Sequence, residues 1–456
     1  MHFVRIDLVQ LFLLAANIAM KKSIVLFFLL ISVCASKAQQ VYTLQQCITY
    51  AVEHNLQLQQ TKLSEKTAKI NNTQAKLAYL PSMNGDATQY YSYGHSLDFT
   101  NNTYDISVSS ISNQFSFNSS LPIFAGLTKY QQLMQTNSDW NAAKYDVAKM
   151  ENDIALNVAG FYLNILNDME QLRIAQRQKL ITQQQKNQTE KLIAAGAMAE
   201  ISINDILATL ANDESNIVTA QNNLDVAILN LKKWLNTDVN QPIQIDTTAP
   251  ANLNANDVDL NFNSTYATSH NMQPSIISSQ WRVKSAERNV LYNRGILFPT
   301  LSLLGSVRTS YSNLYKDMFN TQLNNNLGKT FGFDLSIPFY NGFQNHAALN
   351  RSKISAINAK LNLQIAEKQL QQDIANAILN VKGAAAKLEA TKASALAMQT
   401  AFDANQKKYD AGVINYFDFN TSKNNYAKAL GDLANAKYDY LFKIKILNYY
   451  QGKPLY

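Results

Sequence analysis

The sequence is poor in charged residues, cysteine, proline and histidine. Of its 456 residues, 16% are charged, two are cysteine, eight are proline and five are histidine. The formal net charge is +7, but lysine and arginine are scattered among acids, so no basic patch for nucleic acid is predicted. The two cysteines are Cys34 and Cys47, and removal of a leader containing Cys34 would exclude an internal disulfide.

Catalytic and metal-binding motifs are also missing. The sequence contains no HExxH, CxxC, GxSxG or GxGxxG. Gly328-Lys329-Thr330 resembles the end of a phosphate loop, but Leu323 stands where the first glycine belongs. The histidines have no metal-ligand spacing. We therefore predict no enzymatic activity, no cofactor and no metal site.

The N-terminus predicts export. Met20 is followed by two lysines, an apolar run at 24–33 and a small-x-small site, which predicts cleavage near Gln39. Residues 1–19 are interpreted as an upstream extension from a misassigned start, so 1–38 are assigned to extension and leader. A membrane anchor is the alternative, but the run has half of the ~20 residues that a span needs. Lipidation at Cys34 is disfavoured because Val33 precedes it.

No later segment approaches 18 consecutive apolar residues, the length of a transmembrane helix. We therefore expect any contact with the membrane interior to be made by strands.

Two similar stretches, KLIAAGAMAEISIN and KKYDAGVINYFDFN, predict an internal two-fold repeat. Their glycines, Gly196 and Gly412, lie 216 residues apart. HNLQ and HNMQ, and LPIFAG and IPFYNG, recur at the same offset. We assign repeats to 39–236 and 257–456, joined by a linker at 237–256.

Each repeat has the same predicted order of elements. A helix, at about 53–80 or 270–297, leads to a β hairpin, at 82–121 or 300–339, whose two strands are joined by a polar loop. A long helix follows, at about 127–194 or 343–410, and then a turn near 196 or 412 and a return helix. Prolines lie at both ends of each hairpin, where they end helices or begin them.

The β segments alternate apolar and polar residues with period two. One face carries residues that we predict to face lipid, namely Phe115, Phe117, Leu301, Leu303, Phe331, Phe333 and Leu335. The segments have about the 9–11 residues of a tilted transmembrane strand. A soluble sheet with one buried face is the alternative, but the leader favours an outer membrane.

Four strands cannot close a membrane barrel, because the smallest have about eight. Open strand edges are not tolerated in lipid. Since about eight strands enclose no aqueous channel, we predict three or more copies, and three would supply twelve strands.

The chain resembles the TolC family of outer-membrane efflux and secretion channels. The resemblance rests on TLQQCITYAVEHNLQLQ from Thr43, AKLAYLPSMNG from Ala75, LPIFAG, IPFYNG and the segment YDAGVINYFDFNTSKNNYAKALGDLANAKYDYL. It implies a mainly α fold with membrane β structure: a trimeric α-helical barrel in the periplasm and a twelve-stranded transmembrane β-barrel. It also implies a periplasmic adaptor and an inner-membrane pump of the RND or ABC type as partners.

The resemblance assigns roles to the two turns. They become helix-hairpin tips that dock the adaptor, formed by Ala195, Gly196, Ala411, Gly412 and Val413.

In the family, acids behind the second tip narrow the entrance. Asp418 matches the first of them and Thr421 stands at the second. Tyr409 matches a locking tyrosine, but Ser202 and Ile414 replace its acidic and basic partners. The residues expected at the entrance are Asp418, Tyr409, Asn420 and Asn204.

The expected function is a passive exit duct in the outer membrane of a Gram-negative bacterium, in contact with lipid. The main alternative is a non-channel periplasmic coiled-coil adaptor. A surface receptor that binds ligand through the loops at 94–110 and 312–329 is a second alternative.

Overall fold

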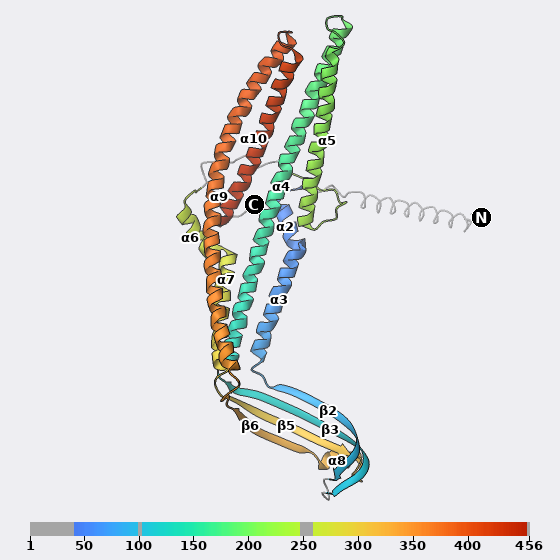
Figure 1. The fold of residues 1–456 in the computed structure, drawn as a ribbon, viewed down its shortest axis with the longest axis vertical. Helices are drawn as coiled ribbons and strands as arrows, with labels where there is room; N and C mark the ends of the chain where they lie inside the picture. Colours follow the sequence, from blue (N-terminus) through green and yellow to red (C-terminus); the bar gives the residue numbers. More distant parts are fainter. Residues whose placement is uncertain (1–40, 99–102, 247–258, 454–456) are drawn as a thin grey trace, which may run out of the picture.

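The computed structural model describes residues 41–98, 103–246 and 259–453. The predicted extension and leader, with Cys34 and the cleavage site near Gln39, lie outside this part, as does much of the predicted linker. Figure 1 shows long helices running along the longest axis of the molecule and a four-stranded sheet that bends away from one end. The two helix-hairpin tips lie at the opposite end.

The elements follow one another in two series. The first contains β1 (Val41–Tyr42), α2 (Leu44–His54), α3 (Leu56–Leu77), β2 (Ser82–Asp98), β3 (Thr103–Ala125), α4 (Thr128–Ala194) and α5 (Ser202–Leu235). The second contains β4 (Gln244–Ile245), α6 (Phe262–Met272), α7 (Pro274–Gly295), β5 (Thr300–Ser312), α8 (Phe319–Asn325), β6 (Gly328–Ser336), α9 (Gln344–Asp410) and α10 (Tyr416–Tyr450).

The two longest helices occupy their predicted ranges to within one residue. Helices α4 and α9 have 67 residues each, which corresponds to about 100 Å at ~1.5 Å per residue. Among the described helices, none is both long enough and apolar enough to cross a membrane.

The strands depart from the predicted bounds. Strands β2 and β3 have 17 and 23 residues and exceed the expected length. Strand β3 continues past Pro122, where we expected it to end, because a bulge between Pro122 and Phe124 accommodates the missing N–H. Strand β6 ends at Ser336, before the predicted end at 339.

Two helix predictions need correction. The segment between β5 and β6 was expected to be a polar loop, but it contains α8. One helix was expected at 270–297, but the structure has two helices in this region. Helix α6 ends at Met272, and α7 begins at Pro274, which lies in the first turn of α7. Proline is favoured in that position because its missing N–H would have no helical partner.

The helices pack side by side in one layer that extends along the long axis, from the sheet to the tips. In the half near the sheet the packing order is α3, α4, α7 and α9, and in the half near the tips it is α5, α4, α10 and α9. Two apolar clusters hold the layer together. One joins α2, α4 and α5 around Cys47, Ile154 and Leu231, and the other joins α7, α9 and α10 around Ile276, Ile374 and Leu447.

The antiparallel sheet has the strand order β2-β3-β5-β6. Its register places Leu121 opposite Leu303, and Leu303 opposite Phe333. Opposed residues share a face, and alternation along each strand then brings all seven residues predicted to face lipid to this one face. The other face carries polar sets such as Asn84, Asn118, Ser306 and Thr330.

Candidate functional site at the helix-hairpin tips

The two tips have the same backbone geometry. In the first, the N–H of Gly196 bonds to the carbonyl three residues back and the N–H of Ala197 to the carbonyl five residues back, both at 2.9 Å. In the second, Gly412 and Val413 form the equivalent bonds at 2.9 and 2.8 Å. Both glycines have φ of +71°, which is the left-handed conformation that ends a helix in this motif. The repeated stretches therefore fold into matching turns.

Large apolar side chains lie exposed at these turns. Val413 is 70% exposed, and Ile201 and Phe417 are also exposed. Ala195 and Ala411, which precede the glycines, are exposed as well. Exposed apolar side chains at the end of a helical hairpin are suited to contact with another protein.

The expected entrance residues occupy different environments. Asp418 is exposed in the first turn of α10, and its N–H donates to the Asn415 side chain at 2.9 Å. This position also favours a carboxylate, because the positive end of the helix dipole lies there. Asn204 is exposed near the start of α5, whereas Asn420 is half-buried.

Tyr409 lies within an aromatic cluster near the second tip. Its ring stacks on Phe419 with 4.9 Å between centroids, and Phe402 and Tyr426 complete the buried part of the cluster. Ile414 also packs against this cluster. The cluster stabilises the α9–α10 hairpin directly behind its turn.

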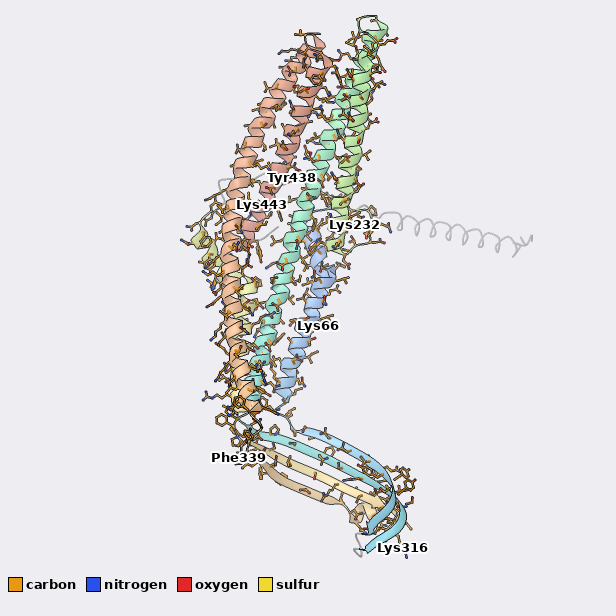
Figure 2. The ribbon with its side chains drawn as sticks, in the orientation of Figure 1. Lys66, Lys232, Lys316, Phe339, Tyr438 and Lys443 are labelled. Atoms are coloured by element: carbon orange, nitrogen blue, oxygen red, sulfur yellow. The ribbon has the colours of Figure 1, made fainter. Side chains whose placement is uncertain are left out.

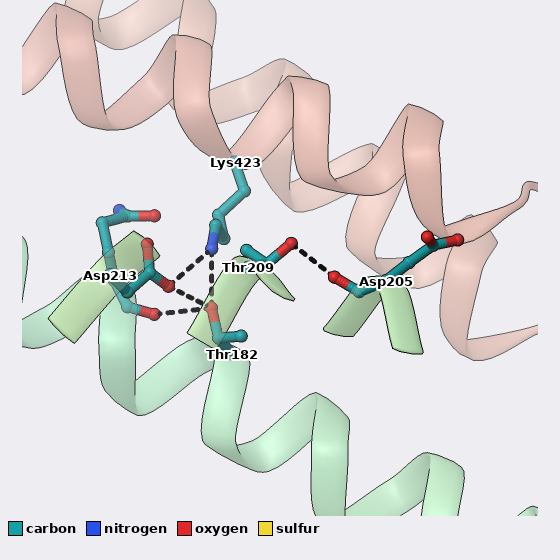
Figure 3. A network of polar contacts seen from close by, with 6 residues as sticks. Thr182, Asp205, Thr209, Asp213 and Lys423 are labelled. Carbon is teal, nitrogen blue, oxygen red and sulfur yellow. Dashed lines mark hydrogen bonds and ion pairs between the residues drawn. The ribbon is translucent and has the colours of Figure 1, made fainter. Parts of the chain in front are cut away.

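A buried polar network joins the two helical hairpins behind the tips. Lys423 of α10 places its Nζ 3.1 Å from Asp213 Oδ2 of α5 and 2.6 Å from Thr182 Oγ1 of α4. Thr182 also donates to Asp213 Oδ2 at 2.5 Å. Figure 3 shows these three side chains converging from three helices. The side chains of Lys423 and Asp213 are only 1% and 7% exposed.

Burial and pairing act in opposite directions on this network. Burial lowers the pKa of the Lys423 ammonium, and the Asp213 carboxylate opposes that shift. Such a pair contributes little net stability when intact, but loss of one partner leaves an uncompensated buried charge. The network therefore constrains the distance between the hairpins more than it adds to stability.

Sequence reasoning did not find this network. Its three members lie far apart in the sequence, so their meeting depends on the tertiary fold. One signal was available: Phe419, Lys423 and Tyr426 follow helical spacing and form one buried stripe. A lysine at a core position of such a stripe indicates a buried partner.

Among the described residues, no group of three or more His, Cys, Asp or Glu could hold a metal ion. The site therefore consists of two tips with exposed apolar side chains and a buried polar network that joins the helices behind them.

The sequence profile of the family described as "Outer membrane efflux protein" matches residues 47–237 and 244–444, most of the chain. The chain belongs to the outer membrane efflux protein family. This membership confirms the resemblance to the TolC family and the predicted location in the outer membrane of a Gram-negative bacterium.

Two curated relatives are named as an outer membrane protein and as a secretion protein. The "Outer membrane protein TolC" of Escherichia coli (strain K12) is 24% identical over 302 residues, which cover 64% of this chain and 59% of the relative. The "Alkaline protease secretion protein AprF" of Pseudomonas aeruginosa is 22% identical over 312 residues, which cover 66% of this chain and 61% of the relative. The matched region thus spans less than two thirds of either relative.

Solved structures show that the fold is that of outer-membrane channels. The Campylobacter jejuni CmeC channel aligns with a TM-score of 0.77 at 18% identity, covering 90% of this chain and 85% of that one. The open-state Neisseria gonorrhoeae MtrE channel aligns with a TM-score of 0.72 at 17% identity, covering 90% of this chain and 89% of that one. The mainly helical fold predicted from the sequence is confirmed.

Proposed function

We propose that this protein is the outer-membrane exit duct of a tripartite efflux pump or type I secretion system. Three copies form the duct, which passively conducts substrate from the pump and adaptor across the periplasm and the outer membrane. The observation that carries the proposal is that, within the described residues, the sheet and the helical layer of the protomer each have two unpartnered edges. The chain performs no chemistry and needs no cofactor in this role.

The sheet supplies the first pair of edges. Within the described residues, β2 and β6 each pair on one side only. Unpaired backbone groups are too costly to leave in lipid. Three copies that join β6 of one to β2 of the next give twelve strands and no free edge.

The helical layer supplies the second pair. On α3, Leu56, Leu63, Ile70 and Leu77 recur every seven residues and are 56–66% exposed. The buried side of α3, at Leu58 and Ala75, packs against α4. The stripe therefore lies on the side of α3 that points away from the layer.

A second stripe lies on α9, at the opposite end of the layer (Figure 1). It contains Ile354, Ile357, Leu361 and Ile365, all exposed. Helical spacing places it opposite the buried positions Ser352 and Ala356. Packing α3 of one copy against α9 of the next forms a head-to-tail interface that can close into a ring.

The repeat explains why one chain contributes two similar sectors to the ring. We assign the halves to 39–236 and 257–456, with 237–256 as linker. The proposal is supported by the first residues of α4 and α9, Thr128 and Gln344, which lie 216 residues apart like the tip glycines.

The apolar sheet face, with Phe117, Leu303 and Phe333, contacts lipid, and the polar face lines the lumen. Exposed aromatic residues mark the periplasmic end of the strands, including Phe298, Phe339 and Tyr340. Figure 2 shows Phe339 where the sheet meets the helices. Aromatic belts of this kind are typical of the membrane–water boundary.

The tips form the periplasmic entrance. Ala195, Gly196, Ala411, Gly412 and Val413 dock the adaptor, which connects the duct to an RND or ABC pump.

Asp418 lines the entrance, with Asn204 and Asn420 as weaker polar contributors, and Tyr409 supports the closed arrangement from its aromatic cluster. Adaptor contacts that favour separated hairpins open the entrance by shifting this equilibrium. A coiled-coil adaptor, the alternative, would have no use for a sheet with an apolar face.

Conductance in planar bilayers tests the proposal. The purified protein should form channels, and Asp418→Asn should lower their selectivity for cations. Leu63→Asp with Ile70→Asp should abolish assembly and conductance, because both charges enter the copy–copy contact.

Ser64→Asp with Asn71→Asp is the matched control. It adds the same charge one residue further along α3, about 100° around the helix, and should still conduct. Absence of channels from the unaltered protein, or equal loss in both variants, would refute the duct.

A further inference from the structure

A polar groove lies between helices α4 and α5 of the first hairpin. Its volume is about 330 Å³, and Ala427 of α10 contributes to its wall. On α4 the lining residues extend from Asp168 to Gln178, which corresponds to about 15 Å of helix at ~1.5 Å per residue. A groove of this volume and length has room for a small, elongated ligand.

The groove carries negative charge. Asp168 and Asp213 line it, and none of the described residues in its lining is a lysine, an arginine or a histidine. Asp213 lies at the end towards the tips, where Lys423 of α10 balances its charge. Asp168 lies at the other end, so the uncompensated negative charge of the groove is located there.

Asp168 is half-buried and is held by amides alone among the described residues. The side-chain nitrogens of Asn164 and Asn167 lie 3.3 and 3.4 Å from its two oxygens, so both hydrogen bonds are long. Burial raises the pKa of Asp168, and the bond from Asn167 opposes that shift. A carboxylate in this environment attracts a cation, because an opposite charge nearby favours its ionised form.

Gln178 presents an unsatisfied acceptor at the other end of the same stretch of α4. Its side chain is 7% exposed, and its buried Oε1 accepts no hydrogen bond within the part of the chain that the structure describes. A buried carbonyl oxygen without a donor is unfavourable, and such atoms are rare in folded proteins. Because Gln178 lines the groove, a ligand bound there can supply the missing donor.

An apolar stretch separates the two polar ends. Ile174 and Ala175 of α4 lie between Asp168 and Gln178, and Ala220 of α5 lines the groove beside them. Within the described chain, no three acids, histidines or cysteines come together to hold a metal ion. The order of a carboxylate, an apolar stretch and a carbonyl oxygen instead matches a ligand with an ammonium group, methylene groups and a second N–H donor in line.

We propose that this groove binds a linear aliphatic polyamine. One ammonium group contacts Asp168, the methylene chain lies over Ile174 and Ala220, and a second amine donates to Gln178 Oε1. Lys423 limits the length of the ligand, because it repels a further ammonium group beyond Gln178. The site goes beyond the proposed duct function and does not depend on it, since all of its residues belong to one copy.

Isothermal titration calorimetry of the full chain in detergent micelles at low ionic strength tests the site. Spermidine is the probe, and butylamine, which has a single ammonium group, is the comparison. Two variants alter the groove, Asp168→Asn and Gln178→Met. Asp225→Asn is the matched control, because it removes an exposed acid of α5 that lies outside the groove.

The unaltered protein should bind one spermidine per chain, about tenfold more tightly than butylamine. Asp168→Asn should weaken both amines about tenfold, whereas Asp225→Asn should change neither. Gln178→Met should weaken spermidine about fivefold and leave butylamine unchanged. Its unfolding midpoint without ligand should not fall, because the substitution removes an unpaired buried oxygen, whereas loss of a purely structural glutamine would lower the midpoint.

Absence of saturable binding would overturn the site, as would equal weakening by Asp168→Asn and Asp225→Asn, which indicates general attraction to a negative surface. Magnesium that binds as tightly as spermidine would show a plain cation site. Unchanged spermidine affinity in Gln178→Met, or butylamine that binds as tightly as spermidine, would overturn the second contact. None of these results bears on channel formation in bilayers, so the polyamine site and the duct can fail separately.

Discussion

Lys423 Nζ lies 3.1 Å from Asp213 Oδ2, and this contact joins helices α10 and α5 of different hairpins. Thr182 of α4 binds both groups. Separation of the hairpins would break both contacts of Lys423, with Asp213 and with Thr182, and would expose two charges. The network therefore opposes any movement that opens the tips.

Replacement of one partner should destabilise the hairpin pair. Lys423→Met leaves Asp213 buried without its cation, which costs about 3–5 kcal/mol. Thermal unfolding of the purified protein should show a lower midpoint. Cells should also admit more of an antibiotic that is too large for ordinary porins, because the tips separate more readily.

The double variant Lys423→Met with Asp213→Asn provides the control for charge. It removes both charges and should regain much of the lost stability, because the effects of substitutions at contacting residues on the free energy of unfolding do not add. Lys428→Met, which alters an exposed lysine of the same helix, should behave like the unaltered protein. A double variant as unstable as the sum of its singles would contradict the coupling.

Gly295 and Gly126 meet backbone to backbone where helices join the sheet. A Cβ on Gly295 would lie 2.5 Å from the Gly126 carbonyl oxygen and 2.8 Å from Thr128 Cγ2. Alanine normally stabilises a helix by about 1 kcal/mol relative to glycine, but Gly295→Ala should lower the unfolding midpoint.

Gly383→Ala is the matched control, because Gly383 lies inside helix α9 and nothing lies within 4 Å of its Cβ position. It should raise the midpoint slightly, as alanine does in a helix. An unfolding midpoint for Gly295→Ala equal to or above that of the unaltered protein would show that the close approach is unimportant.

Alkaline pH should destabilise the helical layer. Burial raises the pKa of the Cys47 thiol to about 12 and that of the Tyr449 phenol to about 12. Both groups keep their proton more tightly when folded, so the unfolded chain releases protons first as pH rises. Stability is fully present below the unfolded pKa values of about 9 and 10 and is lost progressively up to about pH 12.

Tyr449→Phe isolates one contribution. The Tyr449 hydroxyl donates to Gln273 Oε1 at 2.7 Å, so the variant should lose about 1 kcal/mol at neutral pH. Its stability should then fall less steeply above pH 10, as measured by denaturant unfolding across the alkaline range. A slope equal to that of the unaltered protein would exclude Tyr449 as a source of the pH dependence.

Charge at a tip should weaken adaptor docking without unfolding the protein. Val413→Asp places a carboxylate on the exposed apolar end, and in-cell crosslinking should recover at least tenfold less adaptor with the duct. Thr400→Asp, at an exposed site further down α9, is the control. Equal recovery from both variants would remove the second tip from the docking surface.

Local sequence signals predicted much of the fold. Long helices were predictable because their apolar spacing persists and an Ala-Gly pair ends each one. Strand faces were predictable because period-two alternation survives in β5 and β6.

The remaining features depend on tertiary structure. Helix α8 has seven residues, too few for a periodic signal, and forms where Gln322 and Phe319 dock against the sheet. Pro122 suggested a strand end, but a bulge carries β3 past it. The Lys423–Asp213 contact joins residues that are 210 apart in sequence, which no local pattern specifies.

Electron microscopy of the purified full chain in lipid nanodiscs tests the central claim most directly. A trimeric duct predicts a threefold view along the axis, and a side view with about 100 Å of helical cylinder below a belt of about 30 Å. A single rod without threefold views, or a particle whose sheet lies outside the lipid belt, would contradict the account.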